Sequence, residues 1–600
     1  MKGRRFLSRV VAAIAVLFIS AFTYPGAIAV SFVIGLTPAP STSPPPHGVL
    51  PWLHVEQPSE GVPYIADNQG RMVLLHGAIA QGLIDFWSSA EPSRADPLPF
   101  YPIDPAAYEN ACPDNSLYMP TPPLCQSDLE QMAAFGFNSL RLPLSWSLLE
   151  PDRGKFNQLY VDRVAQVVGW AKAVGIYVII DMHQNAYSRF LGPVDGATGK
   201  LRFYTGAPAW ATITDGLPSR EYAGQRELNP AGLEANSNFW YDRNGIQDEY
   251  IAAIAVLAQR FKDDSTVVGY SPFNEPFPGW NLPPGFEDLL LFPFYRRVID
   301  AVTGVRDGLP CWTGFYMPSV CGYRDLGVHD LHHLFFLEAG LLREVTDFPT
   351  HLGLPLSSYP NLVLSLHAYT HQYTFDHLIK PSQDPEQATY PWGGYDQSYS
   401  LGEREARAID AALFISEFGF PPGHDVSVIG SQLLEMERHR VGFAFWTWKE
   451  NGDGNWSMFD SAKPNQSPLP SSGCLRAAKE RLLARVYPIA SADPNLTYHY
   501  DPASGAFSLQ ALGRAGDAPT VVYIPREVTG GSSASGALSN QAVFTNPDGS
   551  RTVTSTPSGG TPCSSPATMK SASTGSTAPF IVIDTDTLSS GMWSNRVRMS

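Results

Sequence analysis

Continuous apolar runs alternate with stretches of helical apolar periodicity from about residue 61 onward. The runs that predict strands are 72–77, 138–143, 176–184, 267–275, 333–338, 362–369, 412–419 and 441–449, and helices are expected between them at 126–135, 155–174, 246–261, 286–305 and 427–439. Uninterrupted apolar strands are typical of parallel sheets that are buried on both faces. Eight such strands with intervening helices predict an α/β fold, a (β/α)₈ TIM barrel over residues 61–486, with functional residues at the carboxyl ends of its strands.

The pattern changes after Tyr487-Pro488. The remaining chain has short alternating runs separated by Asp, Gly, Ser and Pro clusters. This pattern predicts an all-β domain over residues 487–600, a small β-sandwich packed on the barrel.

The amino terminus begins with basic residues, and residues 10–36 then carry no charge. Such a segment is typical of a secretory signal peptide, and it is also long enough to be an uncleaved membrane anchor. We therefore expect residues 1–36 to export the protein, which would be secreted or membrane-anchored outside the cell. Residues 37–60, rich in proline, are expected to form an extended linker.

Composition narrows the range of functions. A net charge of −16 over 600 residues leaves no basic excess to neutralise phosphates, so we expect no nucleic-acid partner. Six cysteines are too few for a disulfide scaffold. The Cys112/Cys125 and Cys311/Cys321 spacings suit small local disulfides, with buried free thiols as the alternative. We find no phosphate loop, metal-ligand cluster or cofactor fingerprint, so no metal or cofactor is expected.

Two glutamates stand at the carboxyl tips of predicted strands. Glu275 lies in Ser271-Pro-Phe-Asn-Glu-Pro276, and Glu417 lies in Ser416-Glu-Phe-Gly419. A single glutamate at such a place is usually a solvated or salt-bridged surface group. Two of them in order, each with aromatic neighbours, suit glycoside hydrolysis, in which one carboxyl gives a proton to the leaving oxygen and the other attacks the sugar carbon.

Further polar and aromatic residues follow the predicted strands in a recognisable order: Arg141, Asp181 with His183, Asn274 with Glu275, His367 with Tyr369, Glu417 and Trp446. Together they resemble the retaining glycoside hydrolases of family 5, clan A. The sequence motifs at residues 181–184, 271–276 and 416–419, with the β-rich tail, look most like its endoglycoceramidase branch. The resemblance implies hydrolysis of the β-glucosyl bond between an oligosaccharide and ceramide.

The retaining mechanism assigns roles to these residues. Glu275 would be the general acid and base, with a raised pKa, and Glu417 the ionised nucleophile. Arg141 and Tyr369 would contact the nucleophile, and Asn274 would donate to the sugar 2-hydroxyl.

The remaining candidates are expected to bind substrate. His183 and His367 would bind sugar hydroxyls, and Trp446 would offer a flat face beneath the sugar. Asp181 would contact the sugar or cap its loop. We expect a monomer that acts on glycolipid in membranes or micelles.

Several alternatives stay open. The segment after the first strand, residues 77–82, lacks the Asn or Lys that many family 5 members carry there. Hydrolysis of glucosylceramide, of a steryl glucoside or of a β-glucan or mannan is therefore also considered. Long insertions at 90–124, 189–238 and 374–399 are expected to wall a closed pocket, which favours a glycolipid over a polysaccharide. A non-catalytic carbohydrate-binding protein would retain aromatics but lose a carboxylate.

Overall fold

The structure is a computed structural model of the 600-residue chain. It describes residues 49–85, 102–113, 122–191, 204–222, 225–281, 285–306, 323–347, 349–350, 356, 358–369, 394–450, 456–460, 474–512, 518, 520–523, 540–545, 551–556, 580–583 and 598–599. The predicted export segment, the Cys311/Cys321 pair and most of the 374–399 insertion lie outside these residues. None of the described helices is long and apolar enough to cross a membrane.

Eight parallel strands close into a barrel, which confirms the predicted fold class. They are β4 (His76–Ile79), β5 (Ser139–Leu144), β6 (Tyr177–Met182), β7 (Val267–Ser271), β8 (Leu334–Glu338), β9 (Leu362–His367), β10 (Ala412–Phe418) and β11 (Gly442–Phe445). Each strand pairs with its sequence neighbour, and β11 pairs with β4 to close the barrel. All eight correspond to predicted strands.

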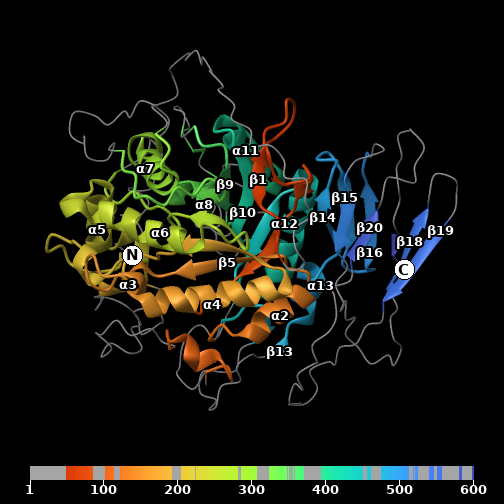
Figure 1. Cartoon of the computed structure of the whole chain (residues 1–600), viewed down its shortest axis with the longest axis horizontal. Helices are drawn as coiled ribbons and strands as arrows, with labels where there is room; N and C mark the ends of the chain where they lie inside the picture. The colour runs from red at the N-terminus through yellow and green to blue at the C-terminus, as the bar shows by residue number, and fades with distance from the viewer. Residues whose placement is uncertain are drawn as a thin grey trace, which may run out of the picture. The chain divides into compact units, whose positions relative to one another are not determined.

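Helices surround this barrel (Figure 1). They are α2 (Gln126–Ala134), α3 (Trp146–Leu149), α4 (Gln158–Val174), α5 (Pro230–Trp240), α6 (Ile246–Phe261), a π-helix (Glu287–Leu291) that continues into α7 (Phe292–Thr303), α8 (Leu341–Thr346), α11 (Tyr395–Ala408), α12 (Asp425–His439) and α13 (Ala477–Leu483). Short 3₁₀ helices cover Pro105–Tyr108, Arg189–Leu191, Ala209–Ala211, Arg226–Leu228 and Arg243–Gly245. Helix α4 begins three residues later than predicted because the Asn157 side chain accepts from the backbone N–H of Tyr160 and caps the helix there.

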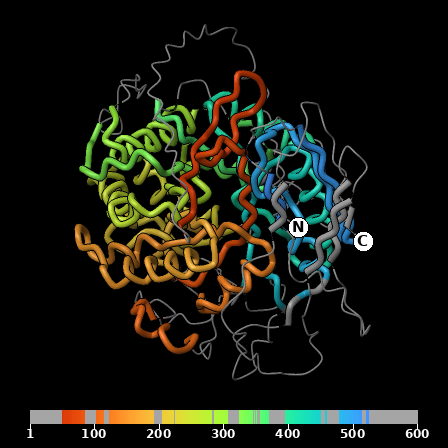
Figure 2. Tube along the Cα trace, turned by 45° about the vertical axis from the view of Figure 1, so that its right-hand side comes forward, coloured from red at the N-terminus to blue at the C-terminus, as the bar shows by residue number. Residues whose placement is uncertain are grey.

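The carboxyl-terminal strands share a sheet with strands that precede the barrel. The strands outside the barrel are β1 (Leu53–Glu56), β2 (Tyr64–Asp67), β3 (Met72–Val73), β12 (Phe459–Asp460), β13 (Cys474–Leu475), β14 (Tyr487–Ser491), β15 (Thr497–Asp501), β16 (Ala506–Gln510), β17 (Thr520–Tyr523), β18 (Asn540–Thr545), β19 (Arg551–Thr556), β20 (Phe580–Ile583) and β21 (Arg598–Met599). The order β1-β2-β3-β14-β17-β20 makes one antiparallel sheet, and Figure 2 shows the red and blue parts of the chain meeting there. A hairpin of β15 and β16 packs on it through a shared apolar core.

This sheet differs from the predicted domain boundaries at two places. Residues 37–60 were expected to be linker, yet Leu53–Glu56 is a strand whose Leu53 and Val55 are buried. These two side chains pack in the cluster that fills the barrel interior, so the strand covers one end of the barrel. The first predicted barrel strand, 72–77, is split, because Met72–Val73 joins the outer sheet and only His76–Ile79 joins the barrel.

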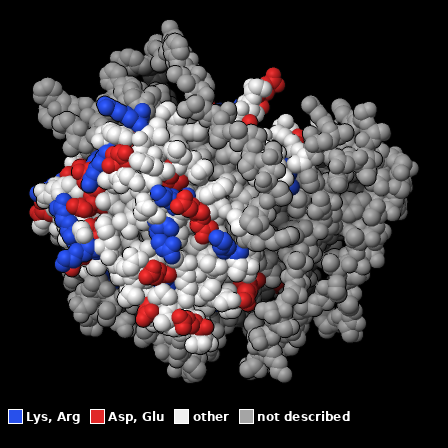
Figure 3. Space-filling model, in the orientation of Figure 1, with Lys and Arg blue, Asp and Glu red and all other residues white. Residues whose placement is uncertain are grey.

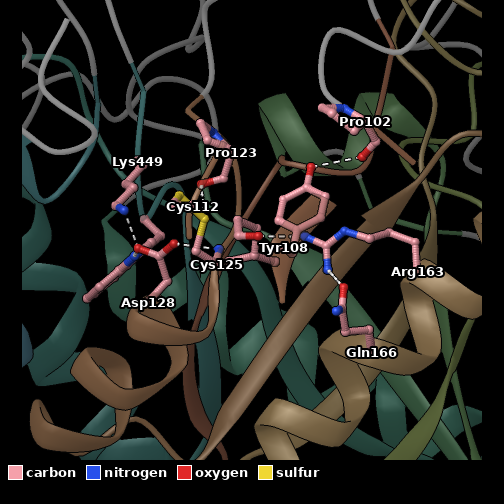
Figure 4. Close-up of a disulfide and its surroundings, with 11 residues drawn as sticks. Pro102, Tyr108, Cys112, Pro123, Cys125, Asp128, Arg163, Gln166 and Lys449 are labelled. Atoms are coloured by element: carbon pink, nitrogen blue, oxygen red, sulfur yellow. Dashed lines mark hydrogen bonds and ion pairs between the residues drawn. A yellow bond between two sulfur atoms is a disulfide. The ribbon is translucent and has the colours of Figure 1, made fainter. Parts of the chain in front are cut away.

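A disulfide joins Cys112 to Cys125, one of the two predicted local bridges (Figure 4). Cys125 is the residue before α2, and its backbone N–H donates to Asp128, 2.8 Å away. Asp128 also accepts from Trp448 at 3.1 Å and forms an ion pair with Lys449. The bridge therefore secures a helix start that holds the segment following β11.

Replacing Cys112 with Ser is expected to destabilise the folded chain by about 2–4 kcal/mol, because the bridge closes a short loop in the unfolded state. The measurement is the urea midpoint without reductant. The Cys112→Ser, Cys125→Ser double variant is the control, and it should have the midpoint of the single variant. A single variant with the wild-type midpoint would contradict this role for the bridge.

Charged side chains are mixed on the described surface. Figure 3 shows Lys and Arg interspersed with Asp and Glu on the face in view, without a continuous basic patch there. This distribution agrees with the absence of a basic excess in the sequence.

Candidate active site

The side chains that end the barrel strands converge because of the two-residue period of a strand. On β6, Tyr177 and Ile179 belong to the cluster inside the barrel, and Asp181 is the next residue on the same face. On β8, Leu334 and Phe336 point inside and Glu338 follows them. On these two strands the sequence thus places apolar residues inside the barrel and a carboxylate at or near the strand end.

Glu417 reaches the interior through an irregularity of β10. The pairing of β10 with both neighbouring strands shifts register after Ile415. Ala412 and Phe414 belong to the interior cluster, so simple alternation would point Ser416 inward. The bulge turns Glu417 inward instead, as bulges near active sites commonly do.

Glu417 is held by one cation and one hydroxyl. Arg141 Nη1 donates to Glu417 Oε1 at 2.5 Å, and the Tyr369 hydroxyl donates to Oε2 at 2.9 Å. Arg141 is fully buried; burial lowers its pKa, but Asp181, Glu338 and Glu417 raise it above the ordinary value, so the guanidinium stays charged. Both predicted contacts to Glu417 are present in the structure.

Glu275 faces a different partner. Its Oε1 lies 3.0 Å from Nδ1 of His367, and its backbone has a φ of 44°, a left-handed conformation that is rare for a residue with a side chain. A small pocket opens beside it, lined by Gln184, Asn185, Arg226, Gly232, Phe277 and Leu341. The side chain of Glu275 is 16% exposed, against 5% for Glu417, so Glu275 is the carboxyl more open to a ligand.

The two carboxyl groups are close enough for a retaining reaction. One oxygen of Glu275 and one of Glu417 lie within 4.8 Å of each other, with a ring nitrogen of His367 inside the same distance. Inverting glycosidases separate their carboxyl groups by about 6.5–9.5 Å to admit a water, whereas retaining ones keep them at about 5–5.5 Å. The spacing fits attack by one carboxylate on the sugar itself.

Residues 110–303 match the cellulase family, glycosyl hydrolase family 5. Endoglycoceramidase I of Rhodococcus hoagii (strain 103S) is 24% identical over 479 residues, which cover 77% of this chain and 78% of the relative. These two matches show that the chain is similar to the glycoside hydrolases of family 5. The predicted family and the predicted enzyme class, a glycoside hydrolase, are therefore confirmed.

Solved structures agree with this assignment. The crystal structure of an endogalactoceramidase superposes with a TM-score of 0.59 at 26% identity, covering 85% of this chain and 98% of that one. Sterylglucosidase 1 of Cryptococcus neoformans superposes with a TM-score of 0.58 at 15% identity, covering 93% and 99%. The second likeness concerns the fold alone.

Three of the predicted family 5 site residues differ from their expected surroundings. Asp181 is fully buried between Arg141, 3.1 Å away, and His183, 2.9 Å away, so it orients these side chains and does not reach the pocket. His367 is also fully buried, and both its ring nitrogens face carboxylates, which leaves none for a sugar hydroxyl. The amide oxygen of Asn274 accepts from Arg141 at 2.7 Å, and its nitrogen donates to the Gln184 carbonyl.

The rings of His183 and Trp446 stack on each other. Their rings lie 5.9 Å apart and nearly parallel, at 14°. Trp446 is partly exposed, which leaves its face available for a sugar ring.

The electrostatics of the unliganded site differ from the expected raised pKa of Glu275. Burial raises the pKa of Glu275, but the hydrogen bond and the charge of His367 lower it, and the net pKa lies below its ordinary value. Burial and the charge of Glu275 raise the pKa of Glu417, against His367 and Arg141, which lower it, and the net pKa is raised. Burial lowers the pKa of His367, but Glu417, Glu338 and Glu275 raise it well above its ordinary value. These shifts favour a charged His367 beside an ionised Glu275 in the unliganded enzyme.

Two neighbours of the site, Glu338 and Trp456, are not among the residues predicted from the sequence. Glu338 ends β8 as the other polar residues end their strands, and this position is the signal that would have found it. Trp456 lies edge-on to Tyr369 with ring centroids 5.7 Å apart, and its place in the chain gives no comparable signal.

Glu275, His367 and Glu417 are also the His, Cys, Asp and Glu group whose spacing would suit a metal ion among the described residues. Their other contacts differ from those of metal ligands. Glu417 already binds the Arg141 cation, and the carboxylates around His367 raise its pKa well above the ordinary value, which favours the charged ring that has no lone pair. The arrangement fits acid, base and nucleophile better than a metal site.

Proposed function

We propose that the chain is a retaining β-glycosidase that hydrolyses the bond between a glycan and ceramide, with Glu417 as nucleophile and Glu275 as general acid and base. One observation carries the mechanism. The two carboxyl groups are close together but have different partners, since Arg141 and Tyr369 donate to Glu417 whereas His367 contacts Glu275. Different partners are what two carboxyl groups with two roles need.

In the first step, Glu417 forms a bond from one carboxylate oxygen to the anomeric carbon as the glycosidic bond breaks. Glu275 gives its proton to the departing oxygen, which leaves as the ceramide hydroxyl. Arg141 and Tyr369 hold the nucleophile in one orientation, so little reorganisation is needed during attack. The product is a glycosyl ester of Glu417.

In the second step, Glu275 takes a proton from a water molecule whose oxygen attacks the anomeric carbon. The ester bond to Glu417 breaks, and the glycan leaves with its original anomeric configuration. The proton has returned to Glu275 and its partner His367, and Glu417 is ionised again. The pocket beside Glu275 is where the aglycone and then the water would enter.

The similarity to endoglycoceramidase I over most of both chains supports the glycan–ceramide bond as the substrate. The 26% identity to an endogalactoceramidase points to the same class of lipid. The second candidate is a single β-linked sugar on ceramide or a sterol, supported by the 26% identity to a glucosylceramidase of Rhizopus delemar over 245 residues. The two candidates differ in whether the enzyme releases an oligosaccharide or one sugar.

Product analysis separates these substrates. The purified protein is incubated in detergent with lactosylceramide or a ganglioside, and in parallel with glucosylceramide and a steryl glucoside. We expect intact oligosaccharide and ceramide from the first pair, and none from the Glu417→Gln variant. Release of glucose from glucosylceramide or the steryl glucoside, with no oligosaccharide release, would contradict the proposed substrate and retain the mechanism.

We further propose that the enzyme acts outside the cell, as a monomer, on glycolipid in membranes or micelles. The uncharged residues 10–36 and the ceramide substrate support this proposal. A fraction found only in the cytoplasm of a producing cell would contradict it.

A further inference from the structure

Glu338 lies behind both candidate catalytic carboxyl groups without entering the pocket. It is fully buried at the carboxyl end of β8. A buried carboxylate is costly unless charged or polar partners satisfy it. The partners of Glu338 therefore indicate its role in the site.

Each oxygen of Glu338 contacts part of the reacting machinery. Oε1 accepts from Arg141 Nη2 at 2.6 Å and from the Ser271 hydroxyl at 3.3 Å. Oε2 accepts from the backbone N–H of Glu275 at 2.6 Å and lies 3.3 Å from Nε2 of His367. The Glu338 carboxylate thus contacts Arg141, which binds the nucleophile Glu417. It also contacts His367, which binds the general acid Glu275, and the backbone N–H of Glu275.

The imidazole of His367 lies between two carboxylates. Its Nδ1 is 3.0 Å from Glu275 and its Nε2 is 3.3 Å from Glu338, where it makes a close charge contact without a hydrogen bond. A neutral imidazole has one N–H and one lone pair, so one of its nitrogens would point a lone pair toward a carboxylate oxygen. The doubly protonated ring instead places its positive charge between the two carboxylates.

The backbone contact has a second effect. Glu275, in the segment that follows β7, adopts a left-handed conformation, and such strain persists only where neighbours enforce it. The hydrogen bond from the Glu275 N–H to Glu338 fixes this peptide, together with the hydrogen bonds that Gln184 Nε2 donates to the carbonyls of Asn274 at 2.8 Å and Glu275 at 3.0 Å. These hydrogen bonds fix the direction from which the acid approaches the glycosidic oxygen.

We propose that Glu338 is a positioning residue that keeps His367 doubly protonated and fixes Glu275, so that Nδ1 of His367 stores the proton that Glu275 delivers. This inference rests on the proposed retaining mechanism. In the first step the proton on Nδ1 passes to Oε1 of Glu275, and Glu275 passes a proton to the leaving oxygen, which leaves His367 neutral. In the second step Glu275 takes a proton from water and returns one to Nδ1.

Titratable groups on several elements lie near His367: Asp181 of β6, Glu275 after β7, Glu338 of β8, Glu344 of α8 and Glu417 of β10. Arg141 of β5 forms ion pairs with Asp181, Glu338 and Glu417. Glu344 accepts from the backbone N–H of His367. Burial raises the pKa of Glu344 well above its ordinary value, which favours the neutral carboxyl. It supplies a matched control, a second buried glutamate beside His367 whose surroundings favour the neutral form.

The test is the pH dependence of kcat/KM for a soluble aryl β-glycoside with Glu338→Gln, which keeps the shape and removes the charge. The alkaline limb reports loss of the proton shared by His367 and Glu275, and the acid limb reports protonation of Glu417. Removing a nearby negative charge makes protons easier to lose, so both limbs should move to lower pH, by about one unit or more. Glu344→Gln should leave both limbs at their wild-type positions.

A lower kcat/KM for Glu338→Gln with both limbs unmoved would overturn the inference, because a merely structural role gives that result. Glu338→Asp, which keeps the charge, should restore the wild-type limbs at reduced kcat. If neither variant folds, the ¹⁵N shifts of His367 in the wild-type enzyme decide. Two protonated nitrogens at pH 8 support the inference, and a neutral ring at pH 7 overturns it.

Failure of the proposed function would look different. Wild-type enzyme without glycosidase activity, or a Glu417→Gln variant as active as wild type, would contradict the mechanism itself. The positions of the limbs in Glu338→Gln bear only on the inference.

Discussion

Glu417→Gln is expected to reduce kcat for an aryl β-glycoside by about 10⁴-fold or more, because an amide cannot form the glycosyl ester and no other group takes its place. The substitution keeps the size of the side chain, its amide oxygen can still accept from Arg141, and its amide nitrogen can donate to the Tyr369 hydroxyl, so the loss should not come from unfolding. The measurement is single-substrate kinetics beside a thermal melt of each variant. Glu130→Gln, on the exposed face of α2, is the control and should behave as wild type.

Azide rescue of a second variant tests the role of Glu417 through the configuration of the product. In Glu417→Gly the side chain is removed from the α face of a β-linked sugar, so azide can enter there. We expect azide to restore turnover and to produce an α-glycosyl azide. A β-glycosyl azide from this variant would mean that Glu417 is not the nucleophile.

Glu275→Gln is expected to lose activity according to the leaving group. A general acid contributes about 10²–10⁴-fold, and this help matters for a poor leaving group such as the ceramide alkoxide. An activated aryl leaving group needs no proton, so formation of the glycosyl-enzyme should remain close to the wild-type rate. The measurement compares the pre-steady-state burst on 2,4-dinitrophenyl glycoside with hydrolysis of the glycolipid.

Azide again separates the roles of the two carboxyl groups. In Glu275→Gly the glycosyl-enzyme still forms, and azide attacks it from the β face to give a β-glycosyl azide. Equal losses on activated and unactivated substrates, without this product, would contradict the assignment of Glu275 as acid and base.

The barrel and its two glutamates were predictable because their signals are local. A parallel strand buried on both faces reads as an apolar run, and a polar residue at its end marks the functional edge. Glu275 and Glu417 each stand at such an end, Glu275 directly before Pro276 and Glu417 shortly before Gly419. The predicted contacts of Arg141 and Tyr369 with Glu417 required only the order of the strands around the barrel.

Features that depend on distant partners were not predictable. Glu338 stands in the sequence like any strand-end carboxylate, and its importance follows from contacts with Arg141, 197 residues earlier, and with His367 on the next strand. The pKa of Glu275 falls for the same reason, since the charged His367 becomes its neighbour only in the folded barrel. Strand β1 lies in the segment predicted as linker. Its buried side chains cover one end of the barrel, and that end exists only once the barrel has closed.

The most direct test of the account is to trap the glycosyl-enzyme. The wild-type protein is treated with a 2-deoxy-2-fluoro-β-glycosyl fluoride, whose second step is slow, and the labelled peptide is identified by mass spectrometry. The account predicts one sugar per chain, attached to Glu417 in the peptide that contains Ser416-Glu-Phe-Gly419. A label on Glu275, or turnover to a product of inverted configuration without any label, would contradict it.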